Sequence, residues 1–228
     1  MIKKHKIKPT KILTTRQNNV KITKEVRDII HGYVMSDGYL RNGSLTVEQS
    51  AEQLRLVKWM YSKLEHLTTG TGIKTVKRFD RRTNRHTYSK RFFTRRFLKG
   101  FNKMWYKVSH INKRTGKPKY VKTLPKSINC FFSKTFISVW YAGDGTKIIG
   151  SLGAKIEATC FNDEEKLIIK QLFKTHYDID IHINKAGFSN SGTQQWTFNI
   201  NSEDYDKFHN IVTEIDLIPE LFPDKLCY

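Results

Sequence analysis

Two aspartates, Asp37 and Asp144, end two stretches of sequence that share a pattern of residue types. The stretches are Ile30–Gly38 (IHGYVMSDG) and Ile137–Gly145 (ISVWYAGDG). Both have isoleucine first, an aromatic residue fourth, a small residue seventh and Asp-Gly at the end. One Asp-Gly pair marks only a helix end and a turn. Two copies in matching context, separated by nearly half of the 228 residues, predict an internal structural repeat.

The residues beside these aspartates predict that the two carboxylates meet. Ser36 and Gly143, with Gly32 one turn earlier in the first stretch, are small enough to let two helices pack closely. The last helical turns would then place Asp37 and Asp144 together at the negative ends of both helix dipoles. A carboxylate pair is unfavourable there unless a cation neutralises it. Oxygen ligands of this kind favour magnesium over zinc.

Two lysines follow the aspartates at similar distances along the chain. Lys122 begins the stretch KTLP, and Lys225 lies near the C-terminal end of the sequence. A metal ion and a lysine at the edge of the core can together stabilise charge on phosphoryl oxygens and position a water, as phosphodiester hydrolysis requires. Because the chain holds 41 Lys and Arg, the similar spacing can also arise by coincidence.

Apolar periodicity and turn signals predict the elements that position these residues. A helix begins at the N-cap candidate Thr23, with Glu25 in its first turn, and ends at Asp37-Gly38. A second apolar helix runs from about Lys134 to Gly143. The other expected elements are strands at 44–49, 154–160, 180–185 and 194–201, helices at 54–67, 98–106, 163–177 and 203–215, and a loop containing Lys113, Arg114, Gly116, Lys117 and Pro118.

The chain is strongly basic, with 41 Lys and Arg against 21 Asp and Glu and a formal net charge of +20. Such a molecule repels itself unless a polyanion neutralises it, and nucleic acid does so because its phosphates release counterions on contact with cations. Hydrophobic residues make up 38% of the chain, which is enough for an ordinary core. The charge indicates nucleic-acid binding, although a non-catalytic basic protein of the ribosomal kind fits it as well.

The highest density of positive charge lies between Lys77 and Lys99, where ten Lys or Arg accompany a single acid, Asp80. Aromatic residues are interleaved, and the turn signal Thr83-Asn84 divides the run into two strands. A two-stranded ribbon fits the major groove, whereas a solvated charge run is the alternative. The residues predicted to contact DNA are Arg41, Lys77, Arg78, Arg81, Arg82, Arg85, Lys90, Arg91 and Arg95.

Further features bear on the compartment and the organisation of the chain. No apolar run approaches the roughly 18 residues that a membrane span needs, and the start of the chain lacks the apolar region of a secretory signal. Cys130, Cys160 and Cys227 have no paired spacing, so we expect reduced, mostly buried thiols in an intracellular reducing compartment. Richness in Lys, Asn and Ile also suits an organelle. We expect a basic arm at 1–24 and two halves at 25–125 and 126–228.

The repeated pattern resembles the LAGLIDADG homing endonucleases, in particular the single-chain, pseudo-symmetric kind encoded within introns. The resemblance covers about residues 24–226 and rests on both Asp-Gly stretches and on the KTLP stretch before the second one. It implies an α+β fold of two pseudo-symmetric αββαββα halves. The two motif helices would lie at the interface of the halves, and two four-stranded antiparallel sheets would form a DNA-binding saddle.

The resemblance also implies roles for single residues. Asp37 and Asp144 would bind the catalytic metals, helped by the backbone carbonyls of Ser36 and Gly143. The lysines Lys122 and Lys225 would lie beside the water network around the scissile phosphates.

Other positions match the family less evenly. Gln49 corresponds to a polar active-site residue, and its counterpart in the second half would lie near Thr159. The sequence departs from the family pattern at His31 and Ser138, which replace a small residue. Lys225 also lies one residue later than the pattern predicts.

By this resemblance the chain is a monomeric, site-specific endonuclease that cuts both strands of double-stranded DNA and leaves short 3′ overhangs. Two or three Mg²⁺ ions would support cleavage, and Ca²⁺ would support binding without cleavage. One alternative is an RNA maturase that binds its own intron RNA, and another is a DNA-binding protein that has lost activity. The presence of both Asp37 and Asp144 favours cleavage, because a maturase needs the basic surface but not both carboxylates.

Overall fold

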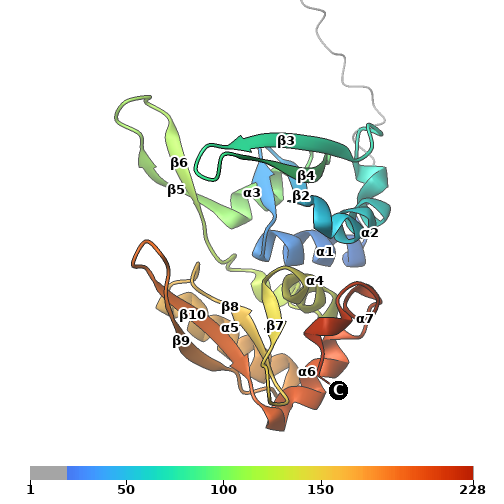
Figure 1. Cartoon of the computed structure of the whole chain (residues 1–228), viewed down its shortest axis with the longest axis vertical. Helices are drawn as coiled ribbons and strands as arrows, with labels where there is room; N and C mark the ends of the chain where they lie inside the picture. Colours follow the sequence, from blue (N-terminus) through green and yellow to red (C-terminus); the bar gives the residue numbers. More distant parts are fainter. Residues whose placement is uncertain (1–19, 228) are drawn as a thin grey trace, which may run out of the picture.

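The computed structural model describes residues 20–227, so most of the predicted basic arm at 1–24 lies outside the described residues. The chain folds into two halves with the same element order, one above the other in Figure 1. The first half contains α1 (Lys24–Met35), β1 (Tyr39–Arg41), β2 (Ser44–Ser50), α2 (Leu54–Leu64), β3 (Lys74–Asp80), β4 (Arg85–Phe93) and α3 (Lys99–Trp105). The second contains α4 (Lys134–Asp144), β7 (Gly145–Lys147), β8 (Ala154–Glu157), α5 (Asp163–Tyr177), β9 (His182–Phe188), β10 (Gln194–Ile200) and α6 (Ser202–Val212).

Each half carries one four-stranded antiparallel sheet. The strand orders are β1-β2-β4-β3 and β7-β8-β10-β9, so the two sheets have the same topology. In the first sheet Val47 lies opposite Phe92, and in the second Ile156 lies opposite Phe198. These four side chains are buried and point toward the helices of their own half. The α+β fold with two αββαββα halves is therefore confirmed.

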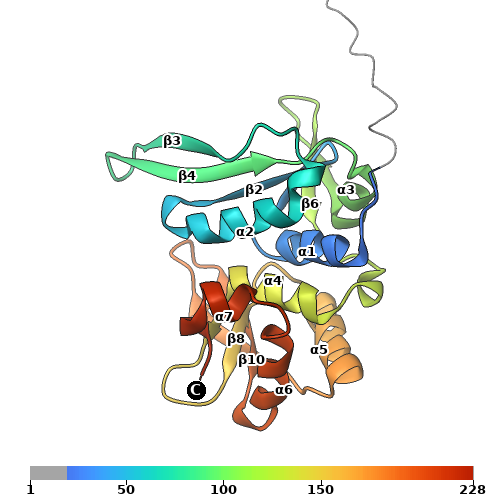
Figure 2. The same cartoon turned by 90° about the vertical axis from the view of Figure 1, so that its right-hand side faces the viewer.

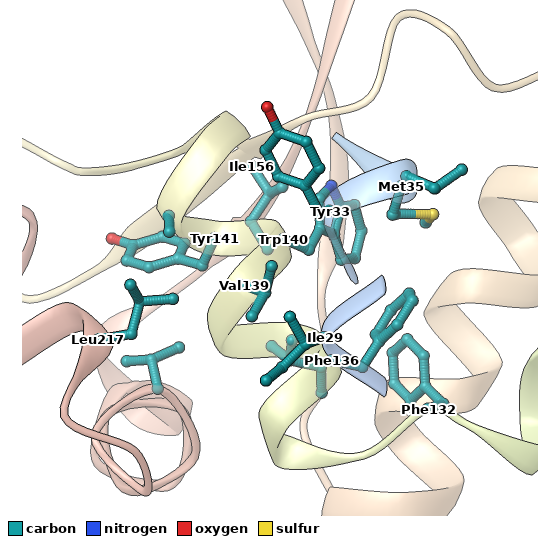
Figure 3. Close-up of a cluster of buried hydrophobic side chains, with 14 of the residues drawn as sticks. Ile29, Tyr33, Met35, Phe132, Phe136, Val139, Trp140, Tyr141, Ile156 and Leu217 are labelled. Atoms are coloured by element: carbon teal, nitrogen blue, oxygen red, sulfur yellow. The ribbon is translucent and has the colours of Figure 1, made fainter. Parts of the chain in front are cut away.

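The two halves pack through the paired helices α1 and α4. Ile29, Phe136 and Val139 lie between the two helices in Figure 3 and are almost fully buried. A Cβ atom on Gly32 would lie 2.5 Å from the Phe136 carbonyl oxygen, and one on Gly143 would lie 2.6 Å from the Ser36 hydroxyl. Since real Cβ atoms do not approach so closely, the backbones can meet only because both positions are glycine.

Side-chain caps start both interface helices. Thr23 accepts a hydrogen bond from the Val26 amide, and Ser133 accepts one from the Phe136 amide. The Ser133 hydroxyl also donates to the buried Asp28 carboxylate over 2.8 Å. This bond ties the start of α4 to the first turns of α1, at the ends of the helices that lie away from the aspartates.

The structure differs from the sequence-based expectation in short and exposed segments. The three-residue strands β1 and β7 were not predicted, because a strand of that length shows no measurable alternation. The predicted loop after α3 contains a hairpin, β5 (Tyr106–Ile111) and β6 (Pro118–Lys122), and a further helix, α7 (Leu217–Leu221), follows α6. In Figure 2 α7 lies against α4, whereas the β5–β6 hairpin stands behind the helices.

The cysteines do not lie where we expected them. Cys130 and Cys160 are exposed and Cys227 is half-buried, so the prediction of mostly buried thiols is wrong. Cys160 and Cys227 lie in connecting segments, and Cys130 is the last residue of the short 3₁₀ helix Ile128–Cys130.

Within residues 20–227, no helix has the length and apolar character that a membrane crossing requires.

Candidate active site

The two motif aspartates lie at the adjoining C-terminal ends of α1 and α4. Asp37 follows the last turn of α1, and Asp144 is the last residue of α4. A Cβ on Gly143 would be 3.3 Å from the Asp37 Oδ2 atom. The Asp37 carboxylate therefore lies against the backbone next to Asp144, so the structure brings together residues that nearly half the chain separates.

The two carboxylates have unequal surroundings. Asp37 is exposed, and its Oδ2 atom accepts a hydrogen bond of 2.8 Å from the Gln49 amide. Asp144 is half-buried, and burial raises its pKa to about 7. The negative charge of Asp37 raises this pKa further, while the Lys122 ammonium opposes the shift. A buried carboxylate beside another carboxylate favours a neutralising cation.

Lys122 and Lys225 occupy equivalent places at the ends of the two motif helices. The Lys122 ammonium donates to the carbonyls of Val34 and Ser36 over 2.7 and 2.8 Å. The Lys225 ammonium donates to the carbonyls of Ala142 and Gly145 over 2.8 and 2.7 Å. Each cation thus meets the negative end of a helix dipole, where carbonyls lack helical partners.

Burial lowers the pKa of both lysines, and the charges of Asp144 and Asp37 oppose the shift in each case. The late position of Lys225 in the sequence does not remove it from the site, because the short 3₁₀ turn at Pro223–Lys225 returns its side chain to α4.

The strand position equivalent to Gln49 in the second half is Ala158. Gln49 follows Glu48, which lies opposite Arg91, and Ala158 follows Glu157, which lies opposite Thr197. Ala158 is buried and offers no side-chain hydrogen bond. Thr159, near which we expected the counterpart, instead accepts a bond of 2.9 Å from the Trp196 amide. A polar strand residue that bonds the motif aspartate is therefore present in the first half, whereas the equivalent strand position of the second half is apolar.

The donor atoms fit a hard divalent cation. Within residues 20–227 no cluster of three or more His, Cys, Asp or Glu side chains could hold a metal ion. Two carboxylates and the nearby carbonyls of Ser36 and Gly143 form an all-oxygen set, which suits magnesium, calcium or manganese. The Ser36 carbonyl already accepts from Lys122, so only its second lone pair is open to a cation.

The two motif positions that depart from the family pattern serve the core. His31 is buried and stacks between the rings of Phe101 and Phe131, with centroids 4.5 and 3.8 Å away. Its Nδ1 atom accepts a hydrogen bond of 2.8 Å from the Trp105 indole. The Ser138 hydroxyl donates to the carbonyl of Lys134, one turn back in α4. Both substitutions therefore leave the helix ends that carry the aspartates unchanged.

Comparison with known proteins agrees with this geometry. The family model described as the LAGLIDADG DNA endonuclease family matches residues 27–208. The chain belongs to this LAGLIDADG family. It is 27% identical over 181 residues to the DNA endonuclease I-ChuI of Chlamydomonas applanata, which covers 72% of this chain and 78% of the relative.

Solved LAGLIDADG structures share the fold. The homing endonuclease I-WcaI, bound to its DNA recognition sequence, matches with a TM-score of 0.72 over 95% of both chains at 14% identity. A double variant of I-DmoI, in complex with nicked target DNA in the presence of manganese, matches with a TM-score of 0.50 at 15% identity. That match covers 85% of this chain and 98% of the I-DmoI chain.

The basic residues predicted to contact DNA divide between the two faces of the first LAGLIDADG sheet. Alternation along the strands puts Arg41, Arg78, Arg85 and Arg91 on the outer face, away from α2. Lys77 and Lys90 share the helix-side face with the buried Phe92, and Lys90 donates to Thr75 over 2.8 Å. Arg81 and Arg82 lie in the exposed turn. Arg95 follows β4 and donates to the Thr68 carbonyl over 2.7 Å.

The outer face is hollowed into a groove of about 1370 Å³. Of the described residues, five cations and no acid line it, namely Arg41, Lys74, Arg95, Arg96 and Lys99. Lys74, Arg96 and Lys99 are absent from our sequence-based set of contacts. Alternation back along β3 from Arg78 would have identified Lys74, which lies on the same face, whereas Arg96 and Lys99 required the tertiary structure.

Two of the predicted contacts are held by an acid on the same face. Glu48 pairs with Arg78 and lies 3.4 Å from Arg91, and it also accepts a bond from Ser89. The Arg78 hydrogen bond is the main cause that lowers the pKa of Glu48. These arginines are therefore oriented before any ligand binds, but part of their charge is neutralised internally.

Proposed function

We propose that this chain is a homing endonuclease that cuts both strands of a long DNA site by Mg²⁺-dependent phosphodiester hydrolysis and leaves short 3′ overhangs. The observation that carries the proposal is the meeting of Asp37 and Asp144 at the lysine-capped ends of α1 and α4. Membership of a family of DNA endonucleases supports it.

The residues of the site divide the work of hydrolysis. Asp37 and Asp144, with the carbonyls of Ser36 and Gly143, would hold the divalent ions. A bound Mg²⁺ supplies charge stabilisation at the phosphate and lowers the pKa of a bound water. Gln49 fixes one carboxylate oxygen of Asp37, so that the other is free to act as a ligand.

The two lysines would stabilise negative charge on the phosphate. The ammonium groups of Lys122 and Lys225 each bind helix carbonyls on one side, and a phosphate could accept from their remaining N–H groups. Burial disfavours their charged forms, and a phosphate that approaches would favour them again. Each half then serves one DNA strand.

The basic groove and the exposed turn of the first half would bind the duplex backbone. One chain contains both catalytic halves, so the enzyme would act as a monomer. An intron-RNA maturase would need the same cationic surface but not both carboxylates, and therefore the aspartate pair favours cleavage.

The test uses a plasmid that carries the DNA target, which is the joined sequence of the exons that flank the intron. Its cleavage is measured with Mg²⁺, with Ca²⁺ and with EDTA. Linear product should form only with Mg²⁺, while Ca²⁺ should support binding alone. Asp37→Asn and Asp144→Asn should each abolish double-strand cutting but retain binding in Ca²⁺. Asp206→Asn, on the exposed side of α6, is the matched control and should cut normally. Undiminished cutting by either motif variant would remove the assignment.

A further inference from the structure

The segment that leads from α3 to Lys122 is more elaborate than the fold requires. In the second half, the equivalent connection from α6 to Lys225 is made by α7, whose Leu217 and Ile218 are buried. In the first half the connection is the β5–β6 hairpin. Figure 1 shows this hairpin leaving the body beside α3 and projecting to the same side as β9 and β10.

Both faces of the hairpin are exposed to solvent. Residues 107–121 are all exposed, and these include Val108, Ile111 and Tyr120 at 52%, 55% and 57% exposure. The strand pairing puts Val108 directly opposite Tyr120. A lone two-stranded hairpin gains little stability in water, and apolar side chains grouped on a projecting element indicate a binding surface.

The charged side chains of the hairpin are also all positive. Residues 106–122 contain six Lys or Arg and no acid. Among the ion pairs formed within residues 20–227, none involves a cation of this segment. Uncompensated cations interleaved with apolar side chains are complementary to a nucleic-acid duplex, which offers phosphates beside sugars and base edges.

The base of the hairpin is fixed beside the active site. Tyr106 pairs with Lys122, and the Tyr106 hydroxyl accepts a bond of 3.4 Å from the Leu40 amide. The Tyr39 ring packs edge-on against Tyr106 with centroids 5.8 Å apart. Because Lys122 itself binds the end of α1, the direction of the hairpin is set relative to the aspartates.

We infer that the β5–β6 hairpin is a separate DNA-binding arm that contacts duplex outside the surface covered by the two sheets. Its cations Lys113, Arg114, Lys117 and Lys119 would bind phosphates. Val108 and Tyr120 would pack against sugars or base edges, as a two-stranded ribbon can in a major groove. This inference rests on the proposed function, since it takes duplex DNA to be the substrate.

The test replaces Lys113, Arg114, Lys117 and Lys119 by alanine and measures how the dissociation constant depends on KCl concentration. The probe is a long non-specific duplex with Ca²⁺. Each lost phosphate contact makes the negative slope of log K (association) against log salt shallower by about 0.9. The slope of the arm variant should therefore be shallower by about 3 to 4. The matched control replaces Lys58, Lys63, Lys170 and Lys174, which remove the same charge from α2 and α5 and should leave the slope nearly unchanged.

A second variant, Tyr120→Ser, keeps the charge. It should weaken binding to the non-specific duplex without altering the salt slope. On a duplex that contains the cleavage target, it should shorten the footprint on one side of the cleavage position. Equal salt slopes for the arm variant and its control would overturn the inference. A wild-type dimer that the arm substitutions dissociate would also overturn it, because a second copy of the chain would then cover the apolar side chains of the hairpin. Wild-type plasmid cleavage reports separately on the proposed function. A wild-type chain that cuts, with an arm variant of unchanged slope, refutes the arm alone.

Discussion

At the residue scale, the two aspartates that the sequence presents as equivalents lie in different surroundings. Asp37 is exposed and bonded to Gln49, whereas Asp144 is half-buried and the strand beside it carries Ala158. The lysines restore the symmetry, because both bind carbonyls at the helix ends. The two halves of the candidate site therefore share a lysine cation but differ in how their carboxylates are oriented.

Replacing Gln49 by alanine should slow the cutting of one DNA strand more than the other. The change removes the hydrogen bond that orients Asp37, and loss of such a partner commonly costs 10 to 100-fold in activity. Strand-labelled target should show nicked product accumulating before linear product. Gln53→Ala, an exposed glutamine at the start of α2, is the control. Equal slowing of both strands would mean that Gln49 serves the two sites together.

At the element scale, the α1–α4 pair determines where the carboxylates lie. Gly32 and Gly143 let the helix backbones touch, and each glycine contacts the opposite helix rather than its own half. The first sheet and its basic groove depend on a different feature, the alternation of Phe92 and Val47 toward α2. The position of the aspartate pair and the basic groove are thus specified by separate elements.

Gly32→Ala should lower the free energy of unfolding by about 1 to 3 kcal/mol, the usual cost of overpacking a tight contact. The new methyl would lie 2.5 Å from the Phe136 carbonyl oxygen, so the helices would have to separate. Urea denaturation measures the loss, and cleavage should fall as the aspartates move apart.

Gly100→Ala provides the control for this change. Gly100 lies in α3 with no atom within 4 Å of an added Cβ, so alanine there should be neutral or stabilising. If the two variants unfold at the same urea concentration, the close approach of α1 and α4 is not a stability determinant.

At the scale of the whole molecule, one aromatic stack joins the first half to the connector that leads into the second. His31 of α1 lies between Phe101 of α3 and Phe131, which precedes α4. Burial, and then the charge of Arg27, lowers the pKa of His31 from 6.5 to about 3. The imidazole is therefore neutral in the folded protein and accepts from Trp105.

Acid should destabilise the protein through this histidine. Because the folded pKa lies below the unfolded one, the stabilisation is complete above about pH 6.5 and is lost progressively as the pH falls toward 3. One such group accounts for about 2 kcal/mol between about pH 7.5 and pH 5. His31→Gln keeps an acceptor for Trp105 but does not titrate, so its urea midpoint should fall less over this range. Parallel losses in both proteins would assign the acid sensitivity elsewhere.

Local signals in the sequence determined the elements that are long and regularly patterned. The Thr23 cap, the helix at 163–177 and the ends of both motif helices follow from the chemistry of single turns, which needs no distant partner. The pairing of Asp37 with Asp144 also follows from the repeat, since two copies of one fold unit must bury their apolar helices against each other.

Only the tertiary structure decided the features that depend on pairing between distant residues. The three-residue strands β1 and β7 exist because β2 and β8 lie beside them. Sheet register determines that Ala158 occupies the second-half position equivalent to Gln49. The β5–β6 hairpin has no buried face, so hydrophobic alternation could not indicate it. Local chemistry specifies elements, whereas register and exposure arise only when strands far apart in the chain meet.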